Sequence, residues 1–190
     1  MENTIIELKF SLDTFYFLIS GILVMWMAAG FAMLEAGLVR SKNTAEILTK
    51  NVALYSIACT MFLLVGYNIM YVDNAEGGFI PSIGALIGTQ AADADHSLES
   101  DFFFQVVFVA TAMSIVSGAV AERMKLWAFL GFAVVLTGFI YPIEGYWTWG
   151  GGFLSEMGFV DFAGSAIVHG AGAAAALAGV LILGARKGKY

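Results

Sequence analysis

Residues 161–186 combine a long apolar run with two ionisable side chains, Asp161 and His169. The run reads DFAGSAIVHGAGAAAALAGVLILGAR and is long and apolar enough to cross a bilayer. Ionisable groups at membrane depth are costly, so they usually face a bundle interior, a cavity or a conduction path. If a helix starts at Asp161, its rise places His169 about 12 Å further in, near the hydrocarbon midplane. The spacing predicts a switchable group where a transported species must pass.

The segment before this run is dense in aromatic residues and glycines, with WTWGGG at 147–152. Tryptophans near a membrane surface usually act as interfacial anchors. Glycines, however, permit positive φ and close backbone approach, which favours a re-entrant or tightly turned segment here. Such backbone is tolerated at membrane depth only where protein buries it or where it lines a cavity.

The elements that must position these residues are membrane helices. The 190 residues are 59% hydrophobic and 13% charged, which indicates an integral membrane protein. Apolar runs near 12–39, 52–71, 102–120, 126–143 and 162–184 predict five transmembrane helices in an all-α fold. The fifth run is built of small residues and so requires a closely packed partner helix. In the third run Phe104 and Phe108, four residues apart, share one face.

The basic residues predict the orientation of these helices. Connections 40–50, 123–125 and 186–189 hold eight of the nine Lys and Arg residues, while 72–101 and 144–161 hold none. The positive-inside rule therefore places the N-terminus outside and residue 190 in the cytoplasm. Glu35, near Arg40, is expected to be paired or to extend to the interface, and Glu122 and Arg123 to anchor their connection. The loop 72–101 is expected to cover part of the external face.

Charge and cysteine content exclude several functions. The net charge is −6, and acidic residues gather in the outer segments. They either favour cations in an outer vestibule or are simply tolerated on the translocated side. No basic patch supports nucleic-acid binding. The single cysteine and two histidines argue against disulfides and against a cysteine-based or multi-histidine metal centre. Neither a cofactor nor an enzymatic activity is expected.

The five helices are an odd number, as the first of two inverted-topology repeats requires. The sequence after residue 184 reads like the opening of a loop. Residues 1–190 are therefore expected to be one transmembrane domain that forms the N-terminal half of a larger protein.

Several spaced motifs resemble the ammonium transporter (Amt/Mep/Rh) family. They are AGLVRSKN at 36–43, FQVVF at 104–108, GAVAERM at 118–124, WTWGGG at 147–152 and the long run at 161–186. The resemblance covers the whole chain but only the first half of a usual member. Trp149 favours the Amt branch, because Rh-like members usually lack this tryptophan.

The resemblance implies roles for particular residues. Phe108 and Trp149 would form an outer site that recruits ammonium, with Phe108 also a gate, Phe104 a weaker gate candidate, and Asp161 supporting the site. His169 would be one of two histidines in a narrow hydrophobic pore; the second would come from the missing half. The family also implies a homotrimer in the cell membrane, methylammonium as a substrate analogue, and PII-type signal proteins as possible partners.

Each assignment has a plainer alternative. Phe108 taken alone fits ordinary packing, and Trp149 an interfacial anchor. His169 fits an interhelical hydrogen bond worth about 0.6 kcal/mol. For Asp161, capping of a helix N-terminus is the better single explanation.

The resemblance predicts ammonium transport: cation capture outside, deprotonation near the pore mouth, and passage of ammonia past His169. The alternative is an ammonium sensor that signals to a cytoplasmic module. A third possibility is a purely structural half-protein, in which replacing His169 changes stability but not the response to ammonium.

Overall fold

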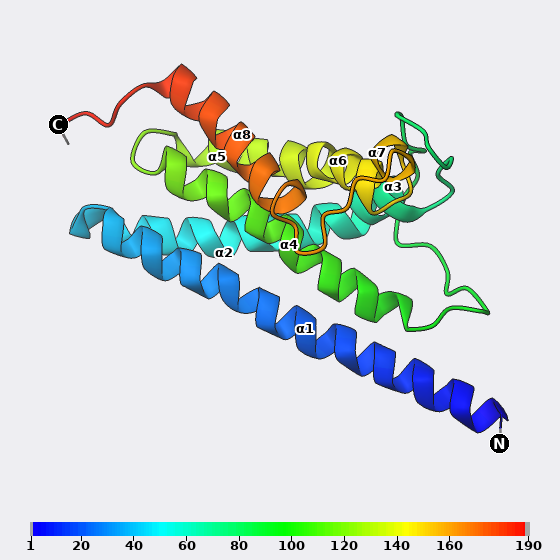
Figure 1. Ribbon diagram of the computed structural model, residues 1–190. Coiled ribbons are helices and arrows are strands. Elements are labelled where there is room, and N and C mark those ends of the chain that lie inside the picture. Colours follow the sequence, from blue (N-terminus) through cyan, green and yellow to red (C-terminus); the bar gives the residue numbers. More distant parts are fainter. Residues whose placement is uncertain (1, 189–190) are drawn as a thin grey trace.

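The computed structural model describes residues 2–188, and these form helices and connections without a strand (Figure 1). Lys189 and residue 190, both used in the predicted orientation, lie outside the described residues. The elements are α1 (Glu2–Leu38), η1 (Ser41–Asn43), α2 (Thr44–Met61), η2 (Phe62–Gly66), α3 (Tyr67–Tyr71), α4 (Leu98–Val120), α5 (Leu126–Val135), η3 (Leu136–Ile140), α6 (Tyr141–Thr148), α7 (Phe153–Glu156) and α8 (Ile167–Leu183).

Four helical segments are long and apolar enough to cross a membrane: Asn3–Leu38, Ser41–Tyr71, Leu98–Val120 and Leu126–Glu156. The fifth, α8, is apolar but has 17 residues. The predicted all-α membrane fold is confirmed, and its five apolar segments are four of membrane length and a shorter fifth. The fourth predicted span was too short, because the helix continues past residue 143 to Thr148 despite Glu144 and Gly145.

The predicted start of the fifth helix was wrong. Helix α8 begins at Ile167, and Gly164 has a φ of +81°, which a regular helix excludes. Residues 157–166 instead run back from α7 toward the middle of the bundle before α8 begins (Figure 1). Asp161 and His169 are therefore not separated by eight residues of helical rise, and the estimate of about 12 Å does not hold. His169 is the third residue of α8.

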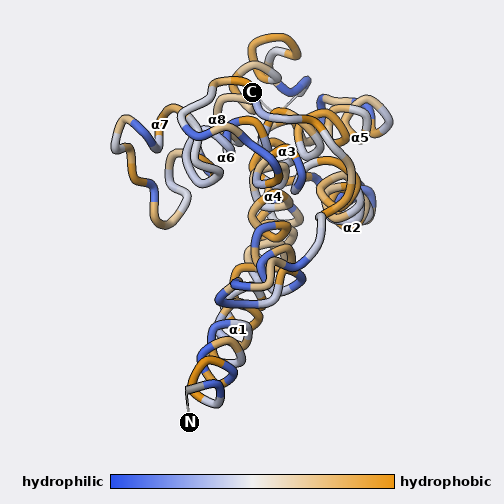
Figure 2. Tube along the Cα trace, turned by 90° about the vertical axis from the view of Figure 1, so that its right-hand side faces the viewer, coloured by the Kyte–Doolittle hydropathy of each residue, from blue (hydrophilic) through white to orange (hydrophobic). Residues whose placement is uncertain are grey.

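The connections gather at two ends of the bundle (Figure 1). The basic end carries residues 39–43, 121–125 and 184–188; the acidic end carries 72–97 and 149–166. Hydrophobic residues predominate on the helices (Figure 2, which looks along the bundle from the acidic end). This distribution suits a bundle whose helices lie in hydrocarbon and whose connections meet water.

Helix α4 is the centre of the bundle, and twelve of its residues are buried. Helix α8 packs closely on it: a Cβ added to Gly172 would lie 2.8 Å from the Ala112 carbonyl oxygen and 2.9 Å from Ile115 Cβ. Small residues allow membrane helices to approach in this way. The predicted close partner of the glycine- and alanine-rich helix is therefore confirmed, and it is α4.

Two π-helical segments, η2 and η3, interrupt neighbouring helices at the same level and contact one another. A Cβ added to Gly66 in η2 would lie 3.2 Å from the Thr137 carbonyl oxygen in η3. Widened π turns often accompany kinks and functional sites. Here they let the α2–α3 and α5–α6 helices cross closely on the way to the acidic end.

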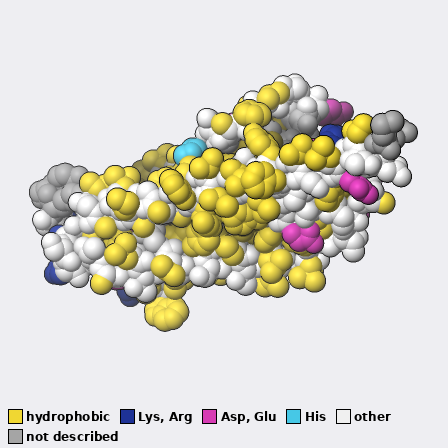
Figure 3. Space-filling model, turned by 90° about the horizontal axis from the view of Figure 1, so that it is seen from below, with side chains coloured by type: hydrophobic (Ala, Val, Ile, Leu, Met, Phe, Trp, Pro, Cys, Tyr) yellow, Lys and Arg dark blue, Asp and Glu magenta, His cyan; other side chains and the backbone are white. Residues whose placement is uncertain are grey.

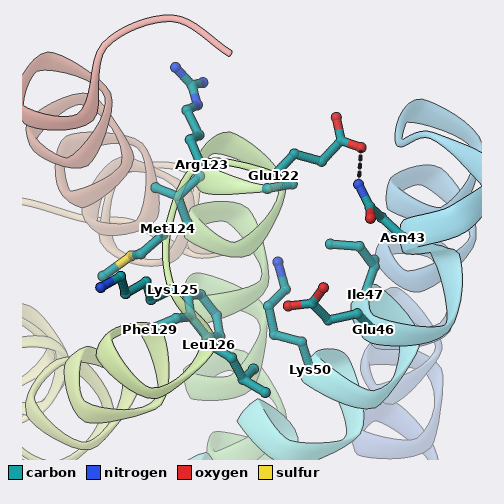
Figure 4. A pocket seen from close by; sticks show the side chains of 12 residues that line it. Asn43, Glu46, Ile47, Lys50, Glu122, Arg123, Met124, Lys125, Leu126 and Phe129 are labelled. Carbon is teal, nitrogen blue, oxygen red and sulfur yellow. Dashed lines mark hydrogen bonds between the residues drawn. The ribbon is translucent and has the colours of Figure 1, made fainter. Parts of the chain in front are cut away.

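Glu122 fastens the connections at the basic end. Its Oε1 accepts hydrogen bonds from the Arg40 backbone N–H at 3.0 Å and from Asn43 Nδ2 at 2.6 Å, the latter visible in Figure 4. Arg40 Nε lies 3.1 Å from Oε1, and Arg186 lies 3.7 Å from Oε2. Arg123 donates to the carbonyl oxygens of Ala119 and Gly184. Glu122 and Arg123 thus anchor this end, as predicted.

A buried ion pair joins three helices nearby. Lys50 Nζ in α2 lies 3.3 Å from Glu35 Oε2 in α1, and the same oxygen accepts a 2.8 Å hydrogen bond from the Ser117 hydroxyl in α4. The side chains are 7% and 2% exposed. The predicted pairing of Glu35 is confirmed, and its partner is Lys50.

The outer face of α1 is strongly apolar. Only 6% of its membrane-length window is buried. Seen from the α1 side, hydrophobic side chains cover most of the surface, with few charged groups (Figure 3). Such a surface suits hydrocarbon or another apolar protein surface.

Candidate functional site

A cavity of about 590 Å³ lies at the acidic end of the bundle. Its lining brings together Phe104, Phe108, Trp149 and Asp161, four of the five residues predicted from the sequence. They come from α4, from the residue after α6 and from the segment before α8. Further lining residues are Phe17, Tyr71, His96, Asp101, Gln105, Thr148, Phe159, Val160, Phe162 and Ala163.

Helix α4 supplies the phenylalanine wall. Phe104 and Phe108 lie one turn apart, with their ring centroids 5.1 Å apart and their planes at 84°. Phe17 of α1 meets Phe104 edge to face at 5.2 Å. Edge-to-face packing leaves part of each ring face free, and ring faces attract cations. The predicted shared face of Phe104 and Phe108 is confirmed.

Trp149 is held by its own indole and by a tight turn. Its Nε1 donates a 2.8 Å hydrogen bond to the Asp161 carbonyl oxygen. The glycines that follow make the turn possible: a Cβ on Gly150 would collide with the Met70 carbonyl oxygen, and Gly151 has a φ of +80°. The tight turn predicted for this segment is confirmed, although Trp147 still belongs to α6.

The Asp161 side chain caps the backbone that leads into α8. Oδ1 accepts from the N–H groups of Gly164 and Ser165, both at 3.0 Å. Oδ2 accepts from those of Ala166 and Ile167, at 2.9 and 2.8 Å. Asp161 thus satisfies free backbone N–H groups as predicted, but it does so from six residues before Ile167, and the N-cap position of α8 is Ala166. Because both carboxylate oxygens are occupied in this way, Asp161 acts on the cavity through its negative charge rather than by binding a ligand directly.

The loop 72–97 folds over the acidic end, where it was expected to cover a face of the protein. Tyr146 donates from its hydroxyl to the Ala75 carbonyl oxygen at 2.6 Å, and Trp147 Nε1 donates to that of Phe79 at 2.8 Å. At the far end of the loop, His96 stacks on Phe17 with centroids 4.3 Å apart. The loop thus shapes one rim of the cavity.

His169 is not brought together with the other predicted residues. It does not line the cavity, and its side chain is exposed on the described part of the chain. The neighbouring Ile167 and Val168 are buried. His169 therefore lies on a surface that this chain leaves open.

Sequence reasoning missed several lining residues. Asp101 and Gln105 share one helical face with Phe104 and Phe108, so their spacing could have identified them. Phe17 and His96 carried no comparable signal, because a contact between α1 and an irregular loop leaves no periodic pattern. Thr148 precedes Trp149 directly and gave no signal of its own.

Comparisons with known proteins agree on one family. The model of the Ammonium Transporter Family matches residues 15–190. A putative ammonium transporter of Synechocystis is 43% identical over 190 residues, which cover 99% of this chain and 43% of that protein. Ammonium transporter Amt2 of Archaeoglobus fulgidus is 42% identical, over 94% of this chain and 40% of that protein.

Solved structures show the same fold. A protein described as a sensor Amt protein superposes with a TM-score of 0.89 at 32% identity, covering all of this chain and 47% of the other. Mep2 of Saccharomyces cerevisiae superposes with a TM-score of 0.81 at 23% identity, which shows the fold alone. The chain thus spans less than half the length of these relatives. By sequence and by fold, it belongs to the ammonium transporter family, and the curated relatives it matches are named as transporters rather than enzymes.

Proposed function

We propose that the complete protein carrying this chain moves ammonium across a membrane, with the cavity at the acidic end as its cation entrance. One observation carries the proposal: Phe108, Trp149 and Asp161, from three separate segments, line one cavity. Relatives that match nearly the whole chain are named ammonium transporters.

The cavity has the chemistry to concentrate a small cation. Phe108 and Trp149 offer aromatic faces, each worth about 0.5–2 kcal/mol to a cation. The negative charge of Asp161 also attracts the cation, and this attraction is stronger in a partly buried cavity than in bulk water. Phe108, and less directly Phe104, would also gate the way inward. This binding is weak enough to release the ion again.

His169 supplies the second step. Ammonium differs from potassium because it has N–H donors and can lose a proton. A neutral imidazole facing a narrow apolar pore can accept a hydrogen bond from ammonium or ammonia. The exposed position of His169 fits a pore completed by the part of the protein beyond this chain, which would supply the partner histidine.

The remaining properties come from the family. Residues 1–190 would form a single transmembrane domain, the N-terminal half, in a homotrimer in the cell membrane. The acidic end would face outside and the basic end the cytoplasm, since basic residues favour the cytoplasmic side. PII-type signal proteins would dock there, and methylammonium would serve as a substrate analogue.

A sensor is the second candidate function. The observation that favours it is the superposition on a sensor Amt protein over the entire chain, with a TM-score of 0.89. In a sensor the same cavity would bind ammonium, and the occupied state would be reported to a cytoplasmic module.

The test is an ammonium-pulse current from the complete protein in proteoliposomes. We expect a saturable current in the wild type. Trp149→Leu removes one aromatic face and should raise the half-saturating ammonium concentration by about three- to tenfold. His169→Ala should change the maximum current instead, because the residue lies beyond the entrance.

Trp147→Leu is the matched control, since Trp147 stacks on Phe79 and does not line the cavity. It should leave the half-saturating concentration within about twofold of wild type. Equal effects of both tryptophan variants would contradict the proposed entrance. Ammonium binding without any current would favour the sensor or a neutral ammonia channel.

A further inference from the structure

We propose that Asp101 is a further ammonium-binding residue, presenting a carboxylate to the cavity beside the aromatic faces, with the Thr148 hydroxyl as a second ligand. This inference rests on the proposed function of the cavity. The ligand class is a monovalent cation with N–H donors, which ammonium and methylammonium represent.

Asp101 has the position that such a ligand needs. It lies in the first turn of α4, on the helical face that also carries Phe104, Gln105 and Phe108, and all four line the cavity. Seven residues of helical rise put it about 10 Å closer to the acidic end than Phe108. A cation entering from that end would meet the carboxylate before the phenylalanine wall.

The Asp101 carboxylate is held in place but not saturated. Tyr67 donates from its hydroxyl to Oδ2 at 2.6 Å, while Gln105 Nε2 lies 3.4 Å from Oδ1, at the long limit of a hydrogen bond. An ionised carboxylate has about four acceptor positions. Oδ1 therefore keeps room for a stronger donor. Tyr67 acts as a positioning residue, because it orients the carboxylate without facing the cavity.

Within the described chain no Lys or Arg side chain pairs with Asp101, and the basic group that lines the cavity with it is the His96 imidazole, which stacks on Phe17. Within residues 2–188, the ion pairs join Lys9 to Asp95, Arg40 and Arg186 to Glu122, and Lys50 to Glu35. A half-buried carboxylate without a cationic partner is costly. A cation bound in the cavity would supply the missing charge.

The contrast with Asp161 strengthens this assignment. Both oxygens of Asp161 are occupied by four backbone N–H groups, so that side chain acts as a cap. Asp101 is the other carboxylate of the cavity lining. Of the two acids, it is the one with an oxygen free to accept an N–H bond from the ion.

Thr148 gives an independent indication. The residue lines the same cavity and is 7% exposed, and its Oγ1 has no hydrogen-bond partner in the described chain. A buried hydroxyl without a partner lowers stability, so such atoms usually serve a ligand or water. In the proposed site this hydroxyl turns toward the cavity and accepts an N–H bond from the bound ion.

The experiment measures ammonium binding on the purified complete protein, without requiring transport. The unfolding temperature is measured at increasing ammonium chloride concentrations, and sodium chloride is reduced in step so that the ionic strength stays constant. The gain in the free energy of unfolding then follows RT ln(1 + [L]/Kd), where [L] is the ammonium concentration. Asp101→Asn should raise the Kd about tenfold, because the bond to ammonium loses its charge assistance. Asp101→Glu should recover part of the affinity.

Asp93→Asn is the matched control, since it removes the same charge from the exposed loop at the same end. It should change the Kd less than twofold. If Asp101→Asn fails to fold, Thr148→Val tests the same site, with an expected rise of about threefold. A wild-type Kd in the Asp101 and Thr148 variants, or no ammonium-dependent stabilisation of the wild type, would overturn the inference. If the Asp101 inference fails in this way but Trp149→Leu still changes the ammonium current, the proposed function remains supported.

Discussion

At the scale of single residues, Asp161 shows how one side chain can position a site. Its four hydrogen bonds organise the backbone from Gly164 to Ile167, and its own carbonyl oxygen holds the Trp149 indole. Replacing it should therefore disturb both the start of α8 and the cavity wall.

We predict that Asp161→Ala lowers the free energy of unfolding by about 1–2 kcal/mol, the usual cost of a lost cap. Asp161→Asn keeps one acceptor oxygen and should cost less. Thermal unfolding in detergent measures both variants. An unchanged unfolding temperature in Asp161→Ala would show that the cap is not needed for stability.

Glu122 gives a pH-dependent prediction. The Arg40 backbone N–H and the Asn43 amide, with the Arg40 side chain, lower the pKa of this carboxyl from 4.5 to about 2. A carboxyl with a lowered folded pKa stabilises the protein above its unfolded pKa. The contribution of Glu122 is thus complete above about pH 4.5 and is lost as the pH falls to about 2.

Glu122→Gln should accordingly lower the unfolding temperature at pH 6 and flatten its fall between pH 4.5 and 2. Thermal scans across this range make the measurement. Glu46→Gln is the control, because Glu46 is exposed and lines the same pocket at the basic end as Glu122 (Figure 4). Parallel pH profiles for wild type and Glu122→Gln would contradict the assignment.

At the scale of elements, the contact between α4 and α8 depends on one glycine. A Cβ at Gly172 meets α4 backbone and Ile115 at under 3.0 Å, whereas a Cβ at Gly170 finds its nearest atom at 4.0 Å. Gly172→Ala should destabilise the protein by about 1–3 kcal/mol through overpacking. Gly170→Ala should be neutral, or stabilising by about 0.5–1 kcal/mol.

Both variants replace a helical glycine with alanine, so the effect of helix propensity cancels when their unfolding temperatures are compared. If both shift the unfolding temperature in the same direction and by the same amount, α8 does not need its close approach to α4.

The sequence predicted the elements better than their ends. Apolar run length identified the four membrane-length segments and the shorter α8, and helical spacing placed Phe104 and Phe108 on one face. The hydropathy pattern placed the start of α8 too early, since hydropathy contains no information on the hydrogen bonds of Asp161 or on the positive φ of Gly164. Phe17 and His96 could not be predicted, because their contact joins α1 to an irregular loop.

At the scale of the whole molecule, we infer that the chain forms one wall of a site rather than a closed pore. His169 and the apolar face of α1 are exposed, and the chain covers 43% of its Synechocystis relative. The inverted-topology repeat and the partner histidine stay predictions, since both concern the part of the relatives' length that this chain does not span.

The central claim is that ammonium enters through the aromatic cavity and continues past His169. The most direct test is a structure of the complete protein, in lipid nanodiscs, at saturating methylammonium. The account predicts density for the ion in the cavity between Phe108 and Trp149, within hydrogen-bonding reach of Asp101, and His169 on the wall of an enclosed pore. An empty cavity with the ion bound elsewhere, or a His169 that faces lipid, would contradict it.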